Sequence, residues 1–170
     1  VELLGLLNID SSLPLIKTNE NYTNFLTPKI SFRLNPSDMK NYSTSSNKVN
    51  VGNIFSKNRL GLTDTFEAGK SITLGLDFKR ERKNDLEKIN KYFEIKLATV
   101  LRDKEENFIP KESTLNRKNS NLFGTIKNEF SKNLSFNYDF ALDNNYKSFE
   151  YNNLNALLSF NNFSTKISFI

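Results

Sequence analysis

The sequence predicts an all-β protein: an antiparallel meander of about seven or eight strands, forming an open, curved piece of a large transmembrane β-barrel. Three observations lead to this prediction. Apolar and polar residues alternate with a period of two, as in strands that have one apolar and one polar face. Longer and shorter polar connections alternate between these segments. The chain is polar on average, with a mean hydropathy of -0.54, yet it contains 15 Phe and 6 Tyr, whereas disordered chains are poor in aromatic residues.

Five segments alternate cleanly, and each is expected to be a strand. In the first, Ile30, Phe32 and Leu34 alternate with polar residues. Pro28 and Pro36 flank this segment, and we expect them to set its limits because proline is tolerated at strand ends and edges. The apolar residues of the other four segments are Ile72, Leu74, Leu76 and Phe78; Phe93, Ile95 and Leu97; Leu134, Phe136, Tyr138, Phe140 and Leu142; and Phe163, Ile167 and Phe169.

Two further segments give weaker patterns. In residues 121–130, Leu122 and Ile126 lie on one face with Gly124 between them, which favours a strand. Residues 83–93 instead carry apolar residues at helical spacing. That stretch is short and runs directly into a strand pattern, so we expect a turn or a single helical turn there.

Residues 148–160 change phase part-way. Phe149 and Tyr151 occupy odd positions, whereas the apolar residues from Leu154 onward occupy even positions. A β-bulge near Asn152–Asn153 would produce this change. A register change at a membrane boundary would produce it equally well, and the sequence leaves both open.

The connections are typical of an outer-membrane barrel. Such barrels have long loops outside and short turns on the periplasmic side, whereas a soluble sandwich has no reason to sort connections in this way. Strand lengths agree, because 71–79 and 134–142 come close to the roughly 9–11 residues that cross a membrane at a tilt. In chain order the connections are 35–70 (long), 80–91 (shorter), 103–120 (long), 131–133 (tight), 143–147 (medium) and 161–162 (tight).

Charged residues fall on the polar faces of these segments. Asp77, Glu94, Lys96 and Asp139 all occupy such positions. In a barrel that face lines a polar lumen, where charges stay hydrated. In a soluble β-sandwich the same residues would face bulk solvent, so alternation alone does not separate these two architectures.

The composition excludes several classes of chemistry. The chain has no Cys and no His, which excludes thiol redox chemistry, a Cys/His zinc site and a histidine general base within it. We therefore expect no catalytic residues, no cofactor and no metal site. The net charge of +5 permits contact with phosphates of any kind. The basic residues are dispersed and lack a clustered aromatic platform, so we expect no nucleic-acid binding.

The chain is expected to be an internal piece of a longer protein. It begins at Val1 without an initiator Met or a basic leader, and an alternating run still continues at Lys166–Ile170. No stretch approaches the roughly 18 consecutive apolar residues of a membrane helix. We therefore expect residues 1–170 to be a partial barrel domain, truncated at both ends, in which 35–70 forms a long polar loop.

Within that loop, residues 53–69 resemble a signature of the LptD family of LPS-assembly (organic solvent tolerance) proteins. In that family a hydrophobic pair leads into Asn-Arg-Phe, then a Gly and an Asp, before the next strand. Residues 26–36 also resemble the family, with a proline opening and a proline closing a strand. This sequence departs from the signature at Leu60, Gly61 and Thr65. The positions that carry the resemblance are Ile54–Phe55, Asn58, Arg59, Asp64, Glu67 and Gly69.

The resemblance implies an outer-membrane translocon that assembles lipopolysaccharide (LPS) at the cell surface by transport, and not an enzyme. It implies a large barrel that is plugged by an outer-membrane lipoprotein (LptE-like) and supplied by a periplasmic bridge protein (LptA-like). Another outer-membrane barrel, such as a porin or a receptor, is the alternative, although it does not explain the motif. A soluble β-sandwich would differ in packing its apolar strand faces against a second sheet.

For the motif we expect first a structural role, in which the loop folds over or into the barrel. Arg59 can bridge to Asp64 or Glu67, and the glycines permit tight bends. Two alternatives stay open: Arg59 contacts LPS phosphates together with Lys57 and Lys70, or the loop binds a partner protein. The candidate site residues are Asn58, Arg59, Gly61, Asp64, Glu67 and Gly69.

Overall fold

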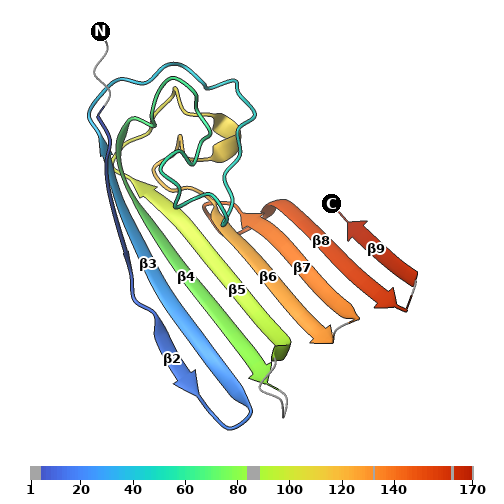
Figure 1. The fold of residues 1–170 in the computed structure, drawn as a ribbon. Helices are drawn as coiled ribbons and strands as arrows, with labels where there is room; N and C mark the ends of the chain where they lie inside the picture. Colours follow the sequence, from blue (N-terminus) through green and yellow to red (C-terminus); the bar gives the residue numbers. More distant parts are fainter. Residues whose placement is uncertain (1–4, 84–88, 132, 162, 170) are drawn as a thin grey trace.

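The computed structural model describes residues 5–83, 89–131, 133–161 and 163–169. Its strands form one antiparallel sheet that winds through the chain as a meander (Figure 1). The prediction of an all-β antiparallel meander is therefore confirmed. The strands are β1 Leu7–Ser12, β2 Leu15–Thr18, β3 Tyr22–Asn35, β4 Gly69–Lys83, β5 Ile89–Arg102, β6 Leu122–Ser131, β7 Leu134–Leu142, β8 Phe149–Phe160 and β9 Phe163–Phe169, with a short 3-10 turn at Lys111–Ser113.

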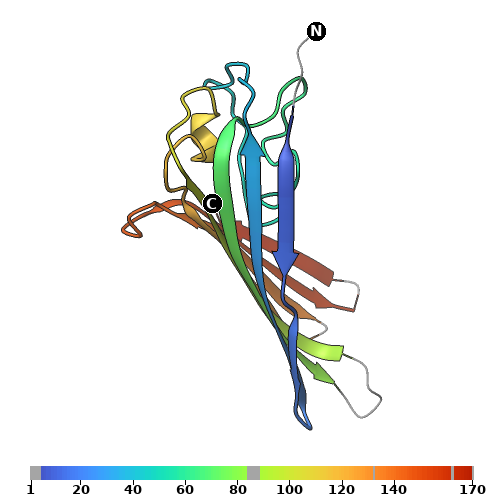
Figure 2. The same cartoon turned by 90° about the vertical axis from the view of Figure 1, so that its left-hand side faces the viewer.

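The first two strands behave as one edge strand that is interrupted at Leu13–Pro14, since both pair with β3. From β3 onward each strand pairs with the next in the chain as far as β9. Residues 7–18, whose alternation is weak, thus add two strands to the segments that the sequence predicts. The edges formed by β1 and β9 lie on opposite sides of the sheet, which is curved and open within the described residues (Figures 1 and 2).

One face of the sheet, the apolar face, carries large exposed hydrophobic side chains. Ile72, Leu74 and Leu76 are 39%, 41% and 40% exposed. In the part of the chain that the structure describes, no second sheet packs on them. This arrangement differs from a β-sandwich, in which such a face would be buried.

The opposite face, here the polar face, carries the charged positions that the sequence placed away from the apolar side. Asp77, Lys96, Thr125 and Asp139 lie directly opposite one another on four successive strands. Lys29 Nζ lies 2.5 Å from Asp77 Oδ2, and Lys96 pairs with its neighbour two residues earlier on the same strand. The charges therefore share one face and compensate one another across it.

Long and short connections lie at opposite ends of the sheet, as predicted. The loops 36–68, 103–121 and 143–148 gather at one end, called the loop end, whereas the connection 19–21 and the last residues of β4, β6 and β8 lie at the other, called the turn end (Figure 1). The turn or helical turn expected over 83–93 falls largely on residues 84–88, which lie outside the described residues. Residues 89–93 belong to β5.

A β-bulge lies at Glu150 of β8, so the predicted position near Asn152–Asn153 was wrong, and Tyr151, opposite Ala141, stays on the polar face. Glu150 has no partner on β7 because the register shifts between Ala141 and Leu142. The bulge rotates Phe149 onto the face that its neighbours on β7 present. Alternation shows that the phase changes, whereas the site of the bulge depends on which residue the adjoining loop engages.

Proline limits β3 at one end only. Pro36 follows the last residue of the strand, as predicted. Pro28 lies inside the strand, which begins at Tyr22, so the prediction that it sets the strand's start was wrong. The interruption at Leu13–Pro14 lies opposite it, and the backbone N–H of Leu13 donates to the Pro28 carbonyl at 3.1 Å.

The hydrophobic core lies between the two longest loops and the loop end of the polar face. The loops are joined directly, because the backbone N–H of Tyr42 donates to the Phe108 carbonyl at 2.9 Å. Most strand residues under the loops are small or apolar, and the strand charges that the loops bury there, Arg33 and Arg102, lie beside Glu67 of the loop. The core residues are Met39, Val49, Ile54, Leu60, Leu62, Ala68, Ile109 and Leu115 outside the strands and Ala98, Val100, Phe123 and Ala141 from the strands.

Among the described residues, no helix has the length and apolar character needed to cross a membrane.

The open edges predict how residues 1–170 behave when they are expressed alone. Unpaired strand edges are not tolerated in lipid and promote association in water. We expect this piece to aggregate or to form mixed oligomers, as measured by light scattering after size-exclusion chromatography. A soluble monomer with a sharp, reversible two-state thermal transition would contradict the prediction.

Candidate functional site

The motif segment forms a tight turn before it enters the sheet. The side-chain amide of Asn58 donates to the Leu62 carbonyl at 2.7 Å, and the Leu62 N–H donates back to Asn58 Oδ1 at 2.9 Å. Gly61 has a positive φ of 63° within this turn, which glycine adopts at low cost. Asn58 and Gly61 thus fix the backbone that presents Arg59 to the sheet.

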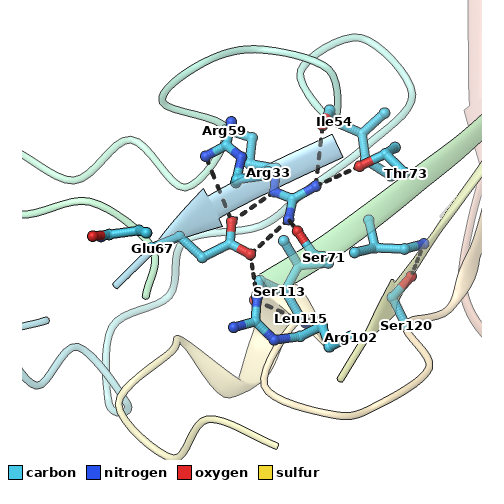
Figure 3. Close-up of polar contacts among 12 residues, drawn as sticks. Arg33, Ile54, Arg59, Glu67, Ser71, Thr73, Arg102, Ser113, Leu115 and Ser120 are labelled. Carbon is cyan, nitrogen blue, oxygen red and sulfur yellow. Dashed lines mark hydrogen bonds and ion pairs between the residues drawn. The ribbon is translucent and has the colours of Figure 1, made fainter. Parts of the chain in front are cut away.

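Arg59 and Glu67 form a buried, two-pronged ion pair. Arg59 Nε lies 2.7 Å from Glu67 Oε2, and Nη2 lies 2.6 Å from Oε1 (Figure 3). The Arg59 and Glu67 side chains are 1% and 2% exposed. Two parallel bonds between guanidinium and carboxylate are the strongest and most direction-specific ion pair that proteins make. Of the two partners expected for Arg59, the structure shows Glu67.

Strand residues complete the shell around this pair. Arg59 Nη1 donates to Thr73 Oγ1 at 2.8 Å and Nη2 donates to Ser71 Oγ at 3.0 Å, both on β4. Arg102 of β5 donates to Glu67 and to the Ala68 carbonyl. The loop is therefore joined to the sheet by hydrogen bonds as well as by apolar contacts.

A third arginine approaches from β3. Arg33 Nη1 lies 3.8 Å from Glu67 Oε2, and Nη2 donates to the Ser56 carbonyl at 2.7 Å. Arg33, Ser71 and Arg102 form a single row across three strands. Three guanidinium groups thus surround one carboxylate, which leaves the cluster with an excess of positive charge. We call Arg33, Arg59, Glu67 and Arg102 the arginine–glutamate cluster.

Glu67 stays ionised because of its neighbours. Burial alone would raise its pKa, but the charge and hydrogen bonds of Arg59, with the charges of Arg102 and Arg33, lower the pKa below its ordinary value of 4.5. A group whose folded pKa is lowered contributes stability above its unfolded pKa, and that contribution disappears as the pH falls through the folded pKa. The cluster should therefore hold the loop at neutral pH and weaken below about pH 4.5.

This pH dependence can be measured by limited pepsin digestion at graded acid pH. We expect cleavage within 36–68 to increase as the pH falls below about 4.5. In a Glu67→Gln protein the rate of loop cleavage, relative to that of an unfolded substrate, should no longer change over this range. If cleavage within 36–68 instead increased as the pH rose toward neutrality, the predicted direction of the pH dependence would be wrong.

Asp64 and Gly69 serve the same loop in different ways. Asp64 lies at the surface, where it accepts bonds from Lys40 Nζ at 2.7 Å and Tyr42 Oη at 2.5 Å, which joins two parts of the loop. Gly69 begins β4 with a φ of 87°. A Cβ at Gly69 would lie 2.9 Å from Arg102 Nη2, so glycine here both forms the bend and leaves space for Arg102.

The hydrophobic pair of the motif inserts into the sheet. Ile54 is fully buried in the core, and its carbonyl accepts a bond from Arg59 at 3.5 Å. The ring of Phe55 lies over Gly75 of β4, where an added Cβ would meet its Cζ at 2.6 Å. Lys29 Nζ lies 5.8 Å from the centre of the same ring. Gly75 is therefore the position on the sheet that receives the Phe55 ring.

The chain matches a model of one protein family, LptD (LPS transport system D), over residues 2–169. The chain belongs to the LptD family. No curated protein matches it. The match covers the sheet and both long loops, and it places the protein in LPS transport at the outer membrane. It also agrees with the motif, which folds in this LptD chain as a link between loop and sheet.

In this LptD chain, substitution of Gly75 tests whether the contact between the Phe55 ring and Gly75 holds the motif on the sheet. Gly75→Val should displace the Phe55 ring and weaken loop packing by about 1–3 kcal/mol, the usual cost of overpacking. The measurement is the urea dependence of unfolding, together with protease sensitivity of 36–68. In a Phe55→Ala background the same substitution should cost much less. Equal costs in the two backgrounds would show that the ring is not the obstacle.

Sequence reasoning on this LptD chain missed two members of the cluster, Arg33 and Arg102. Each is an arginine near the loop end of a strand, on the polar face. Their alignment with Ser71 across three strands becomes visible only once the register is known. The signal available beforehand was the position of both arginines at the boundary between a strand pattern and a long loop.

The second long loop of this LptD chain is held by the bulge in β8. Glu150, which has no partner on β7, accepts bonds from Asn121 Nδ2 at 2.7 Å and Arg117 Nη1 at 3.4 Å. The bulge therefore frees a carboxylate to hold the loop 103–121. Among the described residues, no group of three or more acidic side chains is arranged to hold a metal ion.

Proposed function

We propose that this chain is part of the wall of an outer-membrane translocon that carries LPS to the cell surface and inserts it into the outer leaflet, with no covalent bond made or broken. The observation that carries the proposal is the two-faced sheet: the same strands present exposed apolar side chains on one face and compensated charges on the other. In lipid, strands need every edge paired, so β1 and β9 would pair with further strands of a closed barrel.

The polar face toward the turn end suits the phosphorylated sugar part of LPS. Lys127, Asn137 and Lys166 line a shallow trough on this face. Such a surface offers hydrogen-bond donors and positive charge, which a phosphorylated saccharide needs when it leaves bulk water. The charged side chains of this face would favour the sugar part over the acyl chains, although Tyr92 and Leu157 also line the trough.

The loop of the motif would close the loop end of this lumen. It covers the polar face there and is held by a buried cluster. The burial of Arg59, whose guanidinium already contacts Glu67, Ser71 and Thr73, supports a structural role over direct contact with LPS phosphates. In this proposal residues 1–170 are one part of the barrel domain, and 35–70 is the loop that occludes it.

Family membership supports two protein partners. These are an LptE-like lipoprotein that plugs the barrel and an LptA-like protein that delivers LPS from the periplasm. Outer-membrane barrels have long loops outside and short turns on the periplasmic side. The turn end would accordingly face the LptA-like bridge, and the loop end would face the cell exterior.

The deciding experiment is depletion of the full-length parent protein in its native cell. LPS at the cell surface is measured against LPS retained in the inner membrane. Loss from the surface with accumulation inside supports transport, provided that an unrelated outer-membrane barrel still inserts. Unchanged surface LPS after verified depletion would favour a porin or receptor.

The proposed path can be tested with two neighbouring positions on β6. A photo-crosslinking residue replaces Lys127 on the polar face or Asn128 on the apolar face of the parent protein. LPS adducts are expected at position 127 during transport and not at position 128. Adducts at position 128 alone would mean that LPS does not travel along the polar face.

A further inference from the structure

The apolar face changes character near the turn end of β4. Going along the strand from Ile72 to Phe78, its outward positions are apolar, and the next two outward positions are Arg80 and Arg82. Both arginines are exposed. They therefore stand on the side of the sheet that is otherwise apolar, and not on the side that would line a lumen.

The spacing of charges along β4 places Arg80 at the boundary of the apolar band. Lys70 and Arg80 lie on the same face, ten residues apart. At about 3.3 Å per residue this span is about 33 Å along the strand, or about 23 Å across the membrane at a tilt of ~45°. That height matches the apolar band of about 25 Å found on membrane barrels. Arg80 and Arg82 thus lie at the turn-side interface.

Aromatic side chains surround the two arginines. The guanidinium carbon of Arg80 lies 5.6 Å from the centre of the Tyr22 ring and 5.9 Å from that of Phe78, and that of Arg82 lies 5.9 Å from Tyr22. Phe93 lies directly opposite Arg80 on β5. Membrane barrels carry such aromatic girdles where the apolar band meets the headgroups.

The arginines have an outward positive charge that the described residues do not neutralise. Arg80 Nε donates to Asn24 Oδ1 at 2.7 Å, and no ion pair engages either arginine in the part of the chain that the structure describes. The nearby acids on the strands, Glu81 and Glu94, point to the opposite face, where lysines pair with them. Two guanidinium groups beside one ring repel each other, so an anion from outside would stabilise them.

We propose that Arg80 and Arg82, with Tyr22, Phe78 and Phe93, form a binding surface for the phosphates of anionic phospholipids in the membrane leaflet at the turn end. The planar guanidinium matches phosphate in a two-pronged geometry, and basic residues at an interface attract anionic headgroups. The proposal rests on the membrane placement proposed above and adds the lipid class that this surface selects. LPS phosphates are a different source, which the test separates.

The test uses the full-length parent protein reconstituted in vesicles of phosphatidylcholine with a minor fraction of phosphatidylglycerol. A photo-crosslinking phenylalanine analogue replaces Phe93, beside Arg80, and the two lipid adducts are quantified by mass spectrometry. We expect phosphatidylglycerol adducts to exceed the mole fraction of that lipid. In R80Q/R82Q the enrichment should fall by about thirtyfold, because each of the two basic residues removed from an anionic surface accounts for about fivefold.

A matched control removes two positive charges from the opposite face. K127Q/K166Q should keep the enrichment, whereas a fall equal to that of R80Q/R82Q would overturn the proposal. If R80Q/R82Q does not fold, R80K/R82K takes its place. This variant keeps the charge but loses the planar guanidinium, and it should retain only part of the enrichment. Enrichment in the wild-type protein should also weaken with added salt, and a salt-independent value near the mole fraction would overturn the proposal.

Two further measurements separate phospholipid from LPS as the source of the phosphate, and this inference from the proposed transport function. In vesicles that contain LPS in place of phosphatidylglycerol, LPS should be enriched at position 93 less than phosphatidylglycerol is, and an equal or greater enrichment of LPS would overturn the assignment to phospholipid. Surface LPS is measured separately in cells that carry R80Q/R82Q. Lipid enrichment in a protein whose depletion leaves surface LPS unchanged would sustain this inference while contradicting the proposed transport function.

Discussion

Glu67→Gln is expected to release the loop 36–68 from the sheet, with a loss of about 3–5 kcal/mol, the usual cost of removing one partner from a buried ion pair. The reason is the charge balance at the loop end. Glu67 is the carboxylate to which Arg59 and Arg102 donate and near which Arg33 lies. Without its charge, three buried guanidinium groups would repel one another with nothing between them.

The measurement is made on the parent protein folded in detergent or vesicles. Unfolding in urea gives the free energy, and limited proteolysis reports whether the loop remains attached while the barrel stays folded. We expect cleavage inside 36–68 at denaturant concentrations where the strands still resist protease. Glu67→Asp keeps the charge but shortens the reach to Arg59. Its free energy of unfolding should therefore lie between those of the wild-type protein and Glu67→Gln.

Asp64→Asn provides the matched control for Glu67→Gln. Asp64 belongs to the same loop and motif, but its bonds to Lys40 and Tyr42 are at the surface, where ion pairs contribute little. Its proteolysis pattern should match that of the wild-type protein. If Asp64→Asn released the loop and Glu67→Gln did not, the cluster would not be what holds the loop in place.

The strands could be predicted from the sequence because each has a polar face and an apolar face. Residues 134–142 were predicted as a strand, and β7 has those bounds. β3 and β5 were predicted in part, because their turn-end residues lose the alternation at the interface. The edge strands β1 and β2 could not be predicted with the same clarity, since Leu13–Pro14 interrupts the pattern between them.

The loop packing could not be predicted, because a loop has no period to reveal its buried side. Ile54 and Ile109 meet in the core from loops that are far apart in the sequence. Charge and spacing in the motif gave two possible partners for Arg59, Asp64 and Glu67, and the structure shows Glu67. Arg33 and Arg102 require the register of three strands, which the alternation of each strand does not contain. Local pattern therefore predicted the half of the cluster that lies within one loop.

Leu76→Arg is expected to destabilise the protein in a membrane by about 2–4 kcal/mol, the cost of a charge near the middle of the lipid-facing band. Leu76 lies between Lys70 and Arg80 on the apolar face and is exposed there. A soluble protein would tolerate arginine at such a position, because water would hydrate it. The substitution therefore tests directly whether this face meets lipid or water.

Asn153→Arg is the control at the same level of the sheet. Asn153 lies on the polar face directly opposite Asp139, and its side-chain oxygen has no hydrogen-bond partner among the residues that the structure describes. An arginine there gains a cross-strand ion pair, so the free energy of unfolding should change by less than about 1 kcal/mol. Both variants are compared by urea unfolding in vesicles and by their yield in the outer membrane.

Only a sheet with lipid on one side and water on the other gives this asymmetry. If both arginines were tolerated equally, the apolar face would be hydrated or covered by protein, and the barrel orientation would be wrong. If Asn153→Arg were the costly change, the two faces would be exchanged, and the loops would pack on the outside. A large cost at Leu76 with a small one at Asn153 would mean that the compensated charges face water, where a phosphorylated saccharide can pass, while lipid covers the other side of the same strands.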